Sequence, residues 1–225
     1  MHGLFRVAPD GGVRRFTSQD GLPSTFSRSI AVVSNDKILV GTESGPAFVE
    51  GEKISPLVDN KKGTGPSPIS SPMHATWAVA ARSDGMLFIG TAAGLYYGKD
   101  GRYERASLAS GAIEDDWVTA LAIDGTKDVY VGTYSKGVTH LRFDGSAVKA
   151  THLGGGYVNP DGLVLDGGKL YAATMENLLV RAKDDDASGW TSKKGSAPGR
   201  DVTGVRLASS SIWIGSRRGI SVIKL

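Results

Sequence analysis

Aromatic side chains stand at corresponding points of this 225-residue sequence, each at the start of a short apolar run: Phe26, Trp77, Trp117 and Tyr157. A second group of side chains follows the end of the next apolar run, and from it we single out Glu43, Tyr134, Glu176, Arg217 and Arg218. Aromatic faces offer stacking area, and carboxylates and guanidinium groups offer directed hydrogen bonds. Together the two groups suit a sugar or a peptide segment. The alternative is that the rings only pack in the core.

Some of these groups also have a catalytic or metal-binding interpretation. Glu43 and Glu176 would form a glycosidase pair if they faced each other across one cavity. The acidic run Glu114–Trp117 would bind a metal ion only if other loops added oxygen ligands, and a solvated loop is the alternative. Arg217 and Arg218 would clamp a carboxylate or a phosphate, or form a plain surface charge pair. We expect no catalytic residue and no metal site.

The composition excludes several classes of protein. There is no cysteine, so disulfides, thiolate metal sites and cysteine nucleophiles are absent. The sequence has no P-loop, no Rossmann glycine motif and no HExxH, and we expect no cofactor. A net charge of +3 without a Lys/Arg run longer than two falls short of a nucleic-acid-binding chain. No apolar stretch approaches the ~20 residues of a membrane span.

The elements that position these residues repeat along the chain. Short apolar runs end at Gly41, Gly90, Gly132, Ala173 and Gly215, at separations of 49, 42, 41 and 42 residues. Self-similarity at a fixed period near 42 residues indicates a repeat architecture. The first interval is longer because of a Gly-, Pro- and Ser-rich insertion at 59–72, which we interpret as a flexible loop, or as a lid.

Each repeat predicts four short antiparallel strands separated by turn residues, which is the blade of a β-propeller. The second strand, "LFI", "VYV" or "IWI", is apolar on consecutive residues, so we expect neighbouring blades to cover both of its faces. Trp213 lies in the middle of the last such strand and is expected to be buried. A glycine at the end of the strand lets backbones approach, and the following threonine hydroxyl can bond to nearby backbone.

The sequence therefore predicts an all-β fold: one domain, 1–225, with five four-stranded blades. The blades are expected near 18–58, 73–110, 111–153, 154–195 and 196–225, the last together with 3–17. The C-terminal repeat stops after its third strand, so we expect Val13–Thr17 to supply the fourth strand and close the ring. A closed ring has no exposed strand edge, and we expect a monomer. The segment "GLFRV" is then one strand too many, which is also what a piece of a longer propeller would show.

The segment "DGLPS" at Asp20–Ser24, followed by an apolar strand and "ILVGTESG", resembles the two-component regulator propeller repeat. The segments Leu87–Leu95 and Ile212–Ile220 are similar to the second half of that repeat. The resemblance implies a sensor region outside the cytoplasm of a bacterium. Since Met1 is followed directly by repeat-like sequence, a cytoplasmic protein or a mature domain is the other expectation.

Two functions remain open from the sequence. The first is a non-enzymatic binding or sensory module that presents its loops to a small ligand, a glycan or a protein. The second is a propeller hydrolase or lyase that acts on a carbohydrate or a small molecule. Converging carboxylates would favour the second, because fold alone does not decide between them.

Overall fold

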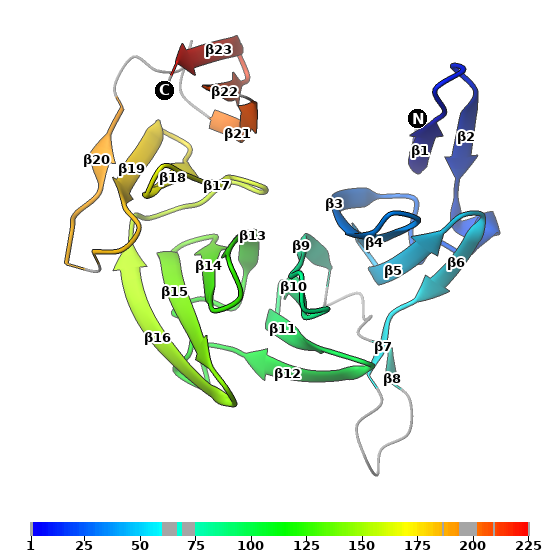
Figure 1. The fold of residues 1–225 in the computed structure, drawn as a ribbon, viewed down its shortest axis with the longest axis horizontal. Coiled ribbons are helices and arrows are strands. Elements are labelled where there is room, and N and C mark those ends of the chain that lie inside the picture. The colour runs from blue at the N-terminus through cyan, green and yellow to red at the C-terminus, as the bar shows by residue number, and fades with distance from the viewer. Residues whose placement is uncertain are drawn as a thin grey trace. The chain divides into compact units, whose positions relative to one another are not determined.

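The computed structural model describes residues 2–59, 67–68, 75–185, 187–193, 202–208 and 210–224, and the regular elements among them are β-strands apart from one short 3-10 turn (Figure 1). The chain divides into two compact units, Met1–Arg105 and Ala106–Leu225. Most of the insertion at 59–72 lies outside the described residues. The single-domain boundary of 1–225 stays a prediction.

Unit 1 contains two four-stranded antiparallel sheets. Blade 1 has the order β3-β4-β5-β6, with strands Ser27–Ser34, Lys37–Thr42, Gly45–Glu50 and Lys53–Pro56. Blade 2 contains β9 to β12, with strands Thr76–Ala81, Leu87–Thr91, Gly94–Lys99 and Arg102–Ala106. The unit also holds a hairpin of β1 (Leu4–Val7) and β2 (Val13–Phe16), the 3-10 turn η1 (Ser18–Asp20), and the short pair β7 (Val58–Asp59) and β8 (Ser67–Pro68).

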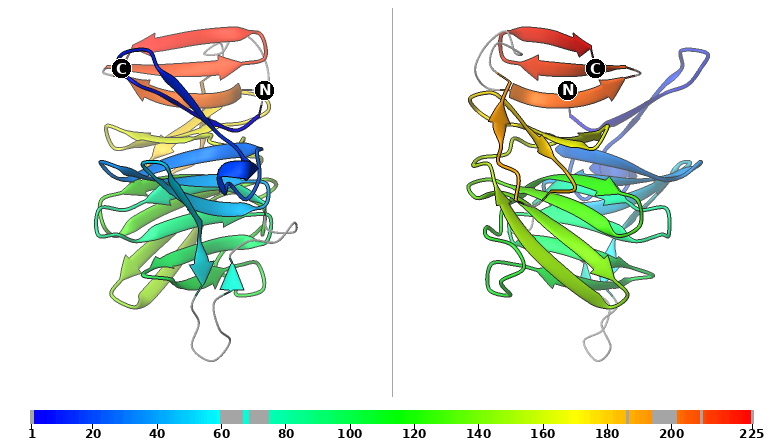
Figure 2. Two further views of the ribbon diagram at one scale, coloured as in Figure 1. Left: turned by 90° about the vertical axis from the view of Figure 1, so that its right-hand side faces the viewer. Right: turned by 60° about the vertical axis from the view of Figure 1, so that its left-hand side comes forward.

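Unit 2 continues the pattern with three sheets, seen from two sides in Figure 2. Blade 3 consists of β13 (Val118–Asp124), β14 (Asp128–Thr133), β15 (Gly137–Asp144) and β16 (Ala147–Gly154). Blade 4 consists of β17 (Leu163–Asp166), β18 (Lys169–Ala173), β19 (Leu178–Ala182) and β20 (Thr191–Ser192). Blade 5 consists of β21 (Val202–Ala208), β22 (Ser211–Ser216) and β23 (Gly219–Lys224).

The second strand of the blades is buried on both faces, as the run of consecutive apolar residues predicts. In β14, Val129 and Val131 are fully buried and Tyr130, on the opposite face, is 1% exposed. Tyr130 belongs to one buried apolar cluster with Leu163 and Leu170 of blade 4. Apolar residues are therefore needed on both faces of this strand, because each face lies against other side chains and not against water.

The Gly-Thr pair at the end of the second strand has the architectural role expected of it. A Cβ atom on Gly132 would lie 2.8 Å from Cγ1 of Val158, so the loop that precedes β17 needs the missing side chain. The Thr91 hydroxyl donates to the carbonyl of Gly94 at 2.8 Å and accepts from the amide of Ala93 at 3.0 Å. The hydroxyl therefore fixes the turn between the second and third strands.

Two expectations about the ends of the chain are wrong. Residues Val13–Phe16 pair with Leu4–Val7 in a local hairpin, and the sheet of blade 5 has three strands among the described residues. The hairpin needs only the short turn at Asp10 and Gly11, so its loop closure costs little. Trp213, which was expected to be buried, is 46% exposed.

The close packing at Gly132 gives the first prediction. Gly132→Ala should destabilise unit 2 by about 1–3 kcal/mol, because the added methyl group forces Val158 or the backbone to move. Gly215→Ala is the matched control in blade 5, since its nearest atom, Oγ1 of Thr203, would lie at 3.4 Å. Urea denaturation of the two variants checks this. Equal stabilities would show that the glycine is not required by packing.

Candidate ligand-binding site

Three of the candidate aromatic residues form one cluster in unit 2. The rings of Trp117 and Tyr134 stack with centroids 4.4 Å apart and an interplanar angle of 14°. Tyr157 meets Tyr134 edge-on, with centroids 4.9 Å apart and an angle of 80°. Tyr134 is 40% exposed, and Trp117 and Tyr157 are half-buried. The aromatic cluster therefore presents an ordered apolar surface that is open to solvent.

The backbone of blades 3 and 4 sets the position of these rings. The amide of Tyr134 donates to the carbonyl of Trp117 at 2.9 Å, which ties the turn after β14 to the start of β13. The amide of Val158 donates to the carbonyl of Thr133 at 3.0 Å, and the Thr119 hydroxyl donates to the carbonyl of Val158 at 2.7 Å. The segment that carries Tyr157 is thereby held against blade 3.

The carboxylate of Asp115 joins the two loops that carry Trp117 and Tyr134. Its Oδ1 accepts a hydrogen bond from the amide of Trp117 at 3.0 Å, and its Oδ2 accepts from the amide and hydroxyl of Ser135 at 2.8 and 2.9 Å. Asp116 caps a neighbouring turn by accepting from the amide of Leu108 at 2.7 Å. Asp115 and Asp116 of the acidic run therefore stabilise the loops around them by hydrogen bonds to backbone amides. Within the described ranges, no cluster of three or more His, Asp and Glu side chains could hold a metal ion.

Unit 1 brings together another pair of candidates, Trp77 and Glu43, through a residue that the sequence analysis missed. The guanidinium of Arg28 lies 3.9 Å from the centre of the Trp77 ring, and its Nη2 lies 3.4 Å from Oε1 of Glu43. One face of Trp77 is therefore covered by a cation that Glu43 holds in place. Beside it lies a cavity of about 190 Å³ lined by Arg28, Phe26 and His2.

A β-bulge explains why Arg28 was missed. In four blades, one residue of the first strand has no partner in the second strand. The unpaired position lies between Ser27 and Ser29, between Val118 and Ala120, between Val202 and Gly204, and at Trp77. Arg28 and Trp77 thus occupy the same bulge position, two residues later than the position of Phe26 and Trp117. A bulge re-aims side chains at the end of a strand, and the alternation of apolar residues gives no sign of it.

The remaining candidates lie on exposed turns. Glu176 follows β18 in blade 4, and Arg217 and Arg218 form the turn between β22 and β23. The amide of Arg218 donates to the Ser216 hydroxyl at 3.2 Å. These three residues share unit 2 with the aromatic cluster, whereas Glu43 and Trp77 belong to unit 1. A convergence of all eight candidates stays a prediction.

The carboxyl groups with a lowered pKa form ion pairs with arginine. The guanidinium of Arg82 bonds to both carboxylate oxygens of Asp84 at 2.9 Å and lowers the pKa of that carboxyl to about 2. Arg14 likewise lowers the pKa of Asp20 to about 2. Asp84 stabilises the turn before β10, and Asp20 caps η1. These displaced values therefore have structural causes.

No protein-family model and no curated protein sequence matches the chain, but solved structures do. The extracellular domain of a hybrid two-component system from B. thetaiotaomicron is 20% identical, with a TM-score of 0.68 over 88% of this chain and 27% of that one. A gluconolactonase from Xanthomonas campestris is 14% identical, with a TM-score of 0.68 over 100% of this chain and 79% of that one. A virginiamycin B lyase from Staphylococcus aureus is 15% identical, with a TM-score of 0.60 over 89% and 70%.

The fold is a β-propeller. The sheet order within each blade and the similarity to these structures agree on it, and they confirm the all-β prediction. The similarity to extracellular domains of two-component systems is also consistent with the repeat resemblance. The chain spans less than a third of the length of those domains, 27% to 30%. None of the described helical residues forms a segment long and apolar enough to cross a membrane.

The role of Asp115 gives the second prediction. Asp115→Ala should lower stability by about 1–3 kcal/mol and weaken the near-ultraviolet circular dichroism of the stacked rings, because it leaves two backbone amides without an acceptor. Glu114→Ala, at the exposed neighbouring position, is the matched control. If both variants keep the wild-type spectrum, Asp115 does not order the aromatic cluster.

Proposed function

We propose that the chain is a non-enzymatic binding module whose aromatic cluster takes a saccharide. The observation that supports this is the stacking of Trp117 on Tyr134 at 4.4 Å with Tyr134 40% exposed. A flat aromatic surface buries the apolar face of a sugar ring, while polar groups at its margin meet the hydroxyl groups.

Pre-organisation supports a binding role for this cluster. Its three residues are fixed by backbone hydrogen bonds and by Asp115, so little side-chain entropy is lost when a ligand is bound. A surface that only filled the core would be buried on all sides, but Tyr134 is open to solvent. Exposed, rigid aromatic rings on loops are typical of recognition surfaces.

The comparisons support a sensory setting outside the cytoplasm for this module. Neighbours with TM-scores of 0.68 and 0.70 are extracellular domains of two-component systems. In such a setting, a bound saccharide would be the signal. The gluconolactonase and lyase neighbours support the alternative, a propeller enzyme acting on a small molecule, and the experiment below separates the two.

The third prediction is that the chain binds saccharides on a glycan and peptide array. Trp117→Ala and Tyr134→Ala should each weaken this binding at least about tenfold (~1.4 kcal/mol), because each removes stacking area. Tyr134→Phe keeps the ring and should retain binding. Arg217→Ala tests whether the turn of blade 5 takes part in the site.

Other array results contradict the proposal in distinct ways. Binding of peptides alone would replace the saccharide by a protein ligand. Saccharide binding that neither aromatic substitution weakens would place the site elsewhere. Turnover of a ligand that is lost in Glu43→Gln or Glu176→Gln would make the chain an enzyme.

A further inference from the structure

Arg28 of unit 1 has a guanidinium group whose hydrogen-bond donors are largely unused. Among the described residues, its side chain makes one hydrogen bond, from Nη2 to Oε1 of Glu43, and this bond is long at 3.4 Å. A charge-assisted bond between arginine and a carboxylate usually measures about 2.7–2.9 Å. A guanidinium carries five N–H donors, so most of those of Arg28 are available to a ligand.

The ring of Trp77 holds this guanidinium in a fixed plane. Arg28 lies in β3 of blade 1 and Trp77 in β9 of blade 2, and the Cζ atom of Arg28 is 3.9 Å from the centre of the ring. Stacking on an aromatic face pre-organises the planar fork of an arginine. Less side-chain entropy is therefore lost when the fork binds an oxyanion.

The cavity of about 190 Å³ beside Arg28 is polar and carries a positive charge. Its described lining residues come from the start of β3 and from the segment that leads into β1: His2, Gly3, Thr25, Phe26, Ser27 and Arg28. None of these residues is acidic, and Arg28 supplies the one permanent charge among them. All of them belong to unit 1, so this lining involves no residue of unit 2. A cavity of this kind suits an anionic group.

The hydroxyl of Ser27 is a second unused group in the same cavity. Its Oγ atom is buried and has no hydrogen-bond partner among the described residues. Buried hydroxyl groups are almost always hydrogen-bonded, so each exception in a folded protein needs an explanation. A bound oxyanion would accept a hydrogen bond from this hydroxyl as well as from Arg28.

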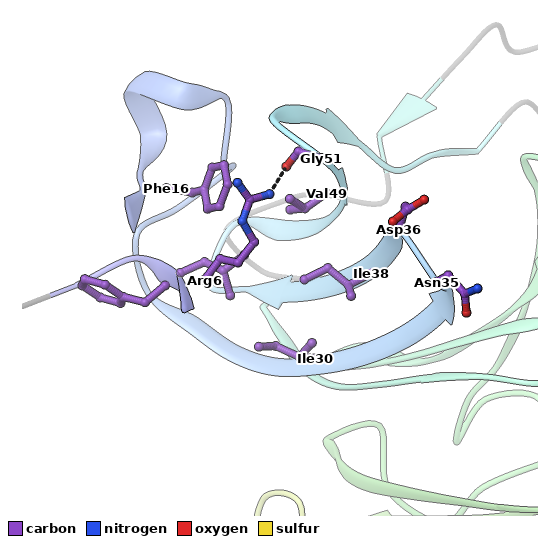
Figure 3. Close-up of a pocket in the computed structure, with 10 residues that line it drawn as sticks. Arg6, Phe16, Ile30, Asn35, Asp36, Ile38, Val49 and Gly51 are labelled. Carbon is purple, nitrogen blue, oxygen red and sulfur yellow. Dashed lines mark hydrogen bonds between the residues drawn. The ribbon is translucent and has the colours of Figure 1, made fainter. Parts of the chain in front are cut away.

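A second cavity of unit 1, of about 290 Å³, differs in both respects (Figure 3). It is lined by apolar side chains such as Ile30 and Val49, together with Arg6. The guanidinium of Arg6 donates to the carbonyl of Gly51 at 3.1 Å and forms an ion pair with Glu52. The donors of Arg6 are thus engaged within the protein, whereas those of Arg28 are not.

The charge balance of the cavity favours a carboxylate over a phosphate. A carboxylate has one negative charge and two oxygens that match the fork of a guanidinium. A phosphate monoester carries nearly two charges at neutral pH. The described lining offers one permanent positive charge, and the carboxylate of Glu43 already lies 3.4 Å from it. A second negative charge on the ligand would therefore be unbalanced.

We propose that the cavity beside Arg28 binds a carboxylate group, either of a small acid or at the end of a larger molecule. Arg28 donates paired hydrogen bonds to the carboxylate, and Ser27 donates another. Trp77 and Glu43 are positioning residues, because they act on the ligand through Arg28. The site is separate from the aromatic cluster of unit 2, so it can fail while saccharide binding holds, and the reverse.

The fourth prediction is that propionate binds at Arg28, whereas propionamide, its neutral counterpart of similar shape, does not. In a titration at constant ionic strength, nuclear magnetic resonance should show saturable shifts of the Arg28 Nε–H signal and of the Ser27 backbone amide. Arg28→Gln should abolish the shift at Ser27. Arg28→Lys should weaken binding at least tenfold, because an ammonium group keeps the charge but lacks the fork. Arg105→Gln, at an exposed arginine of unit 1 outside the cavity, should bind like the wild type.

Ser27→Ala separates binding from stability. Because the hydroxyl has no partner among the described residues, its removal should leave the free energy of unfolding unchanged and weaken propionate binding at least threefold. A loss of stability with unchanged binding would show that the hydroxyl serves the fold and not the site.

Three other results would overturn the proposal. They are the absence of a saturable shift with propionate, an equal shift with propionamide, and unchanged binding in Arg28→Gln. Inorganic phosphate that binds more tightly than propionate would overturn the assignment to a carboxylate. Circular dichroism confirms that each variant is folded.

Discussion

The second strand of each blade, packed between other side chains on both faces, is the constraint on which the structure depends. Leu39, Phe88 and Tyr130 are at most 1% exposed in three different blades. Truncating one such large side chain costs about 3–5 kcal/mol, more than most single contacts in a domain contribute. Because this strand lies in the middle of the sheet, it also fixes the first and third strands through their hydrogen bonds. The remaining parts of each blade are arranged around it.

The same constraint places the loops that carry function. At the end of the second strand, glycine allows close approach and threonine closes the turn, while a bulge widens the first strand opposite them. In both units one amide then joins the two loops: Glu43 donates to Phe26 at 3.0 Å, and Tyr134 donates to Trp117 at 2.9 Å. The backbone frame is thus constant, and the side chains on it vary. In blade 3 the frame holds stacked aromatic rings, and in blade 1 it holds the carboxylate that orients Arg28.

Much of this arrangement could be predicted from the sequence. The apolar triplets and their spacing near 42 residues indicate the blades, and the Gly-Thr pair indicates the turn. Trp117, Tyr134 and Tyr157 could be named because they recur at the loop positions. The structure places Tyr134 against both of the other rings, and a role of the three in binding stays a prediction.

Three features could not be predicted from the sequence, and each has a physical reason. A bulge changes the register by one residue without changing composition, so Arg28 could not be placed beside Trp77. The partner of Val13–Phe16 is not encoded by its own apolar pattern, because a local hairpin and a distant sheet edge offer the same hydrogen bonds. Trp213 has the sequence of a buried position, and its exposure depends on what lies across from its sheet. Strand pattern alone does not contain that information.

Hydrogen exchange followed by nuclear magnetic resonance tests most directly the claim that the second strand of each blade is the stable centre of the fold. The amides of β14, paired on both edges and buried on both faces, should exchange far more slowly than those of β23, which pairs with one strand among the described residues and carries the exposed Ile220 and Val222. That result would support the second strand as the stable centre of the fold. Equal protection of β23 and β14 would contradict it, because it would show that blade 5 is covered as fully as blade 3.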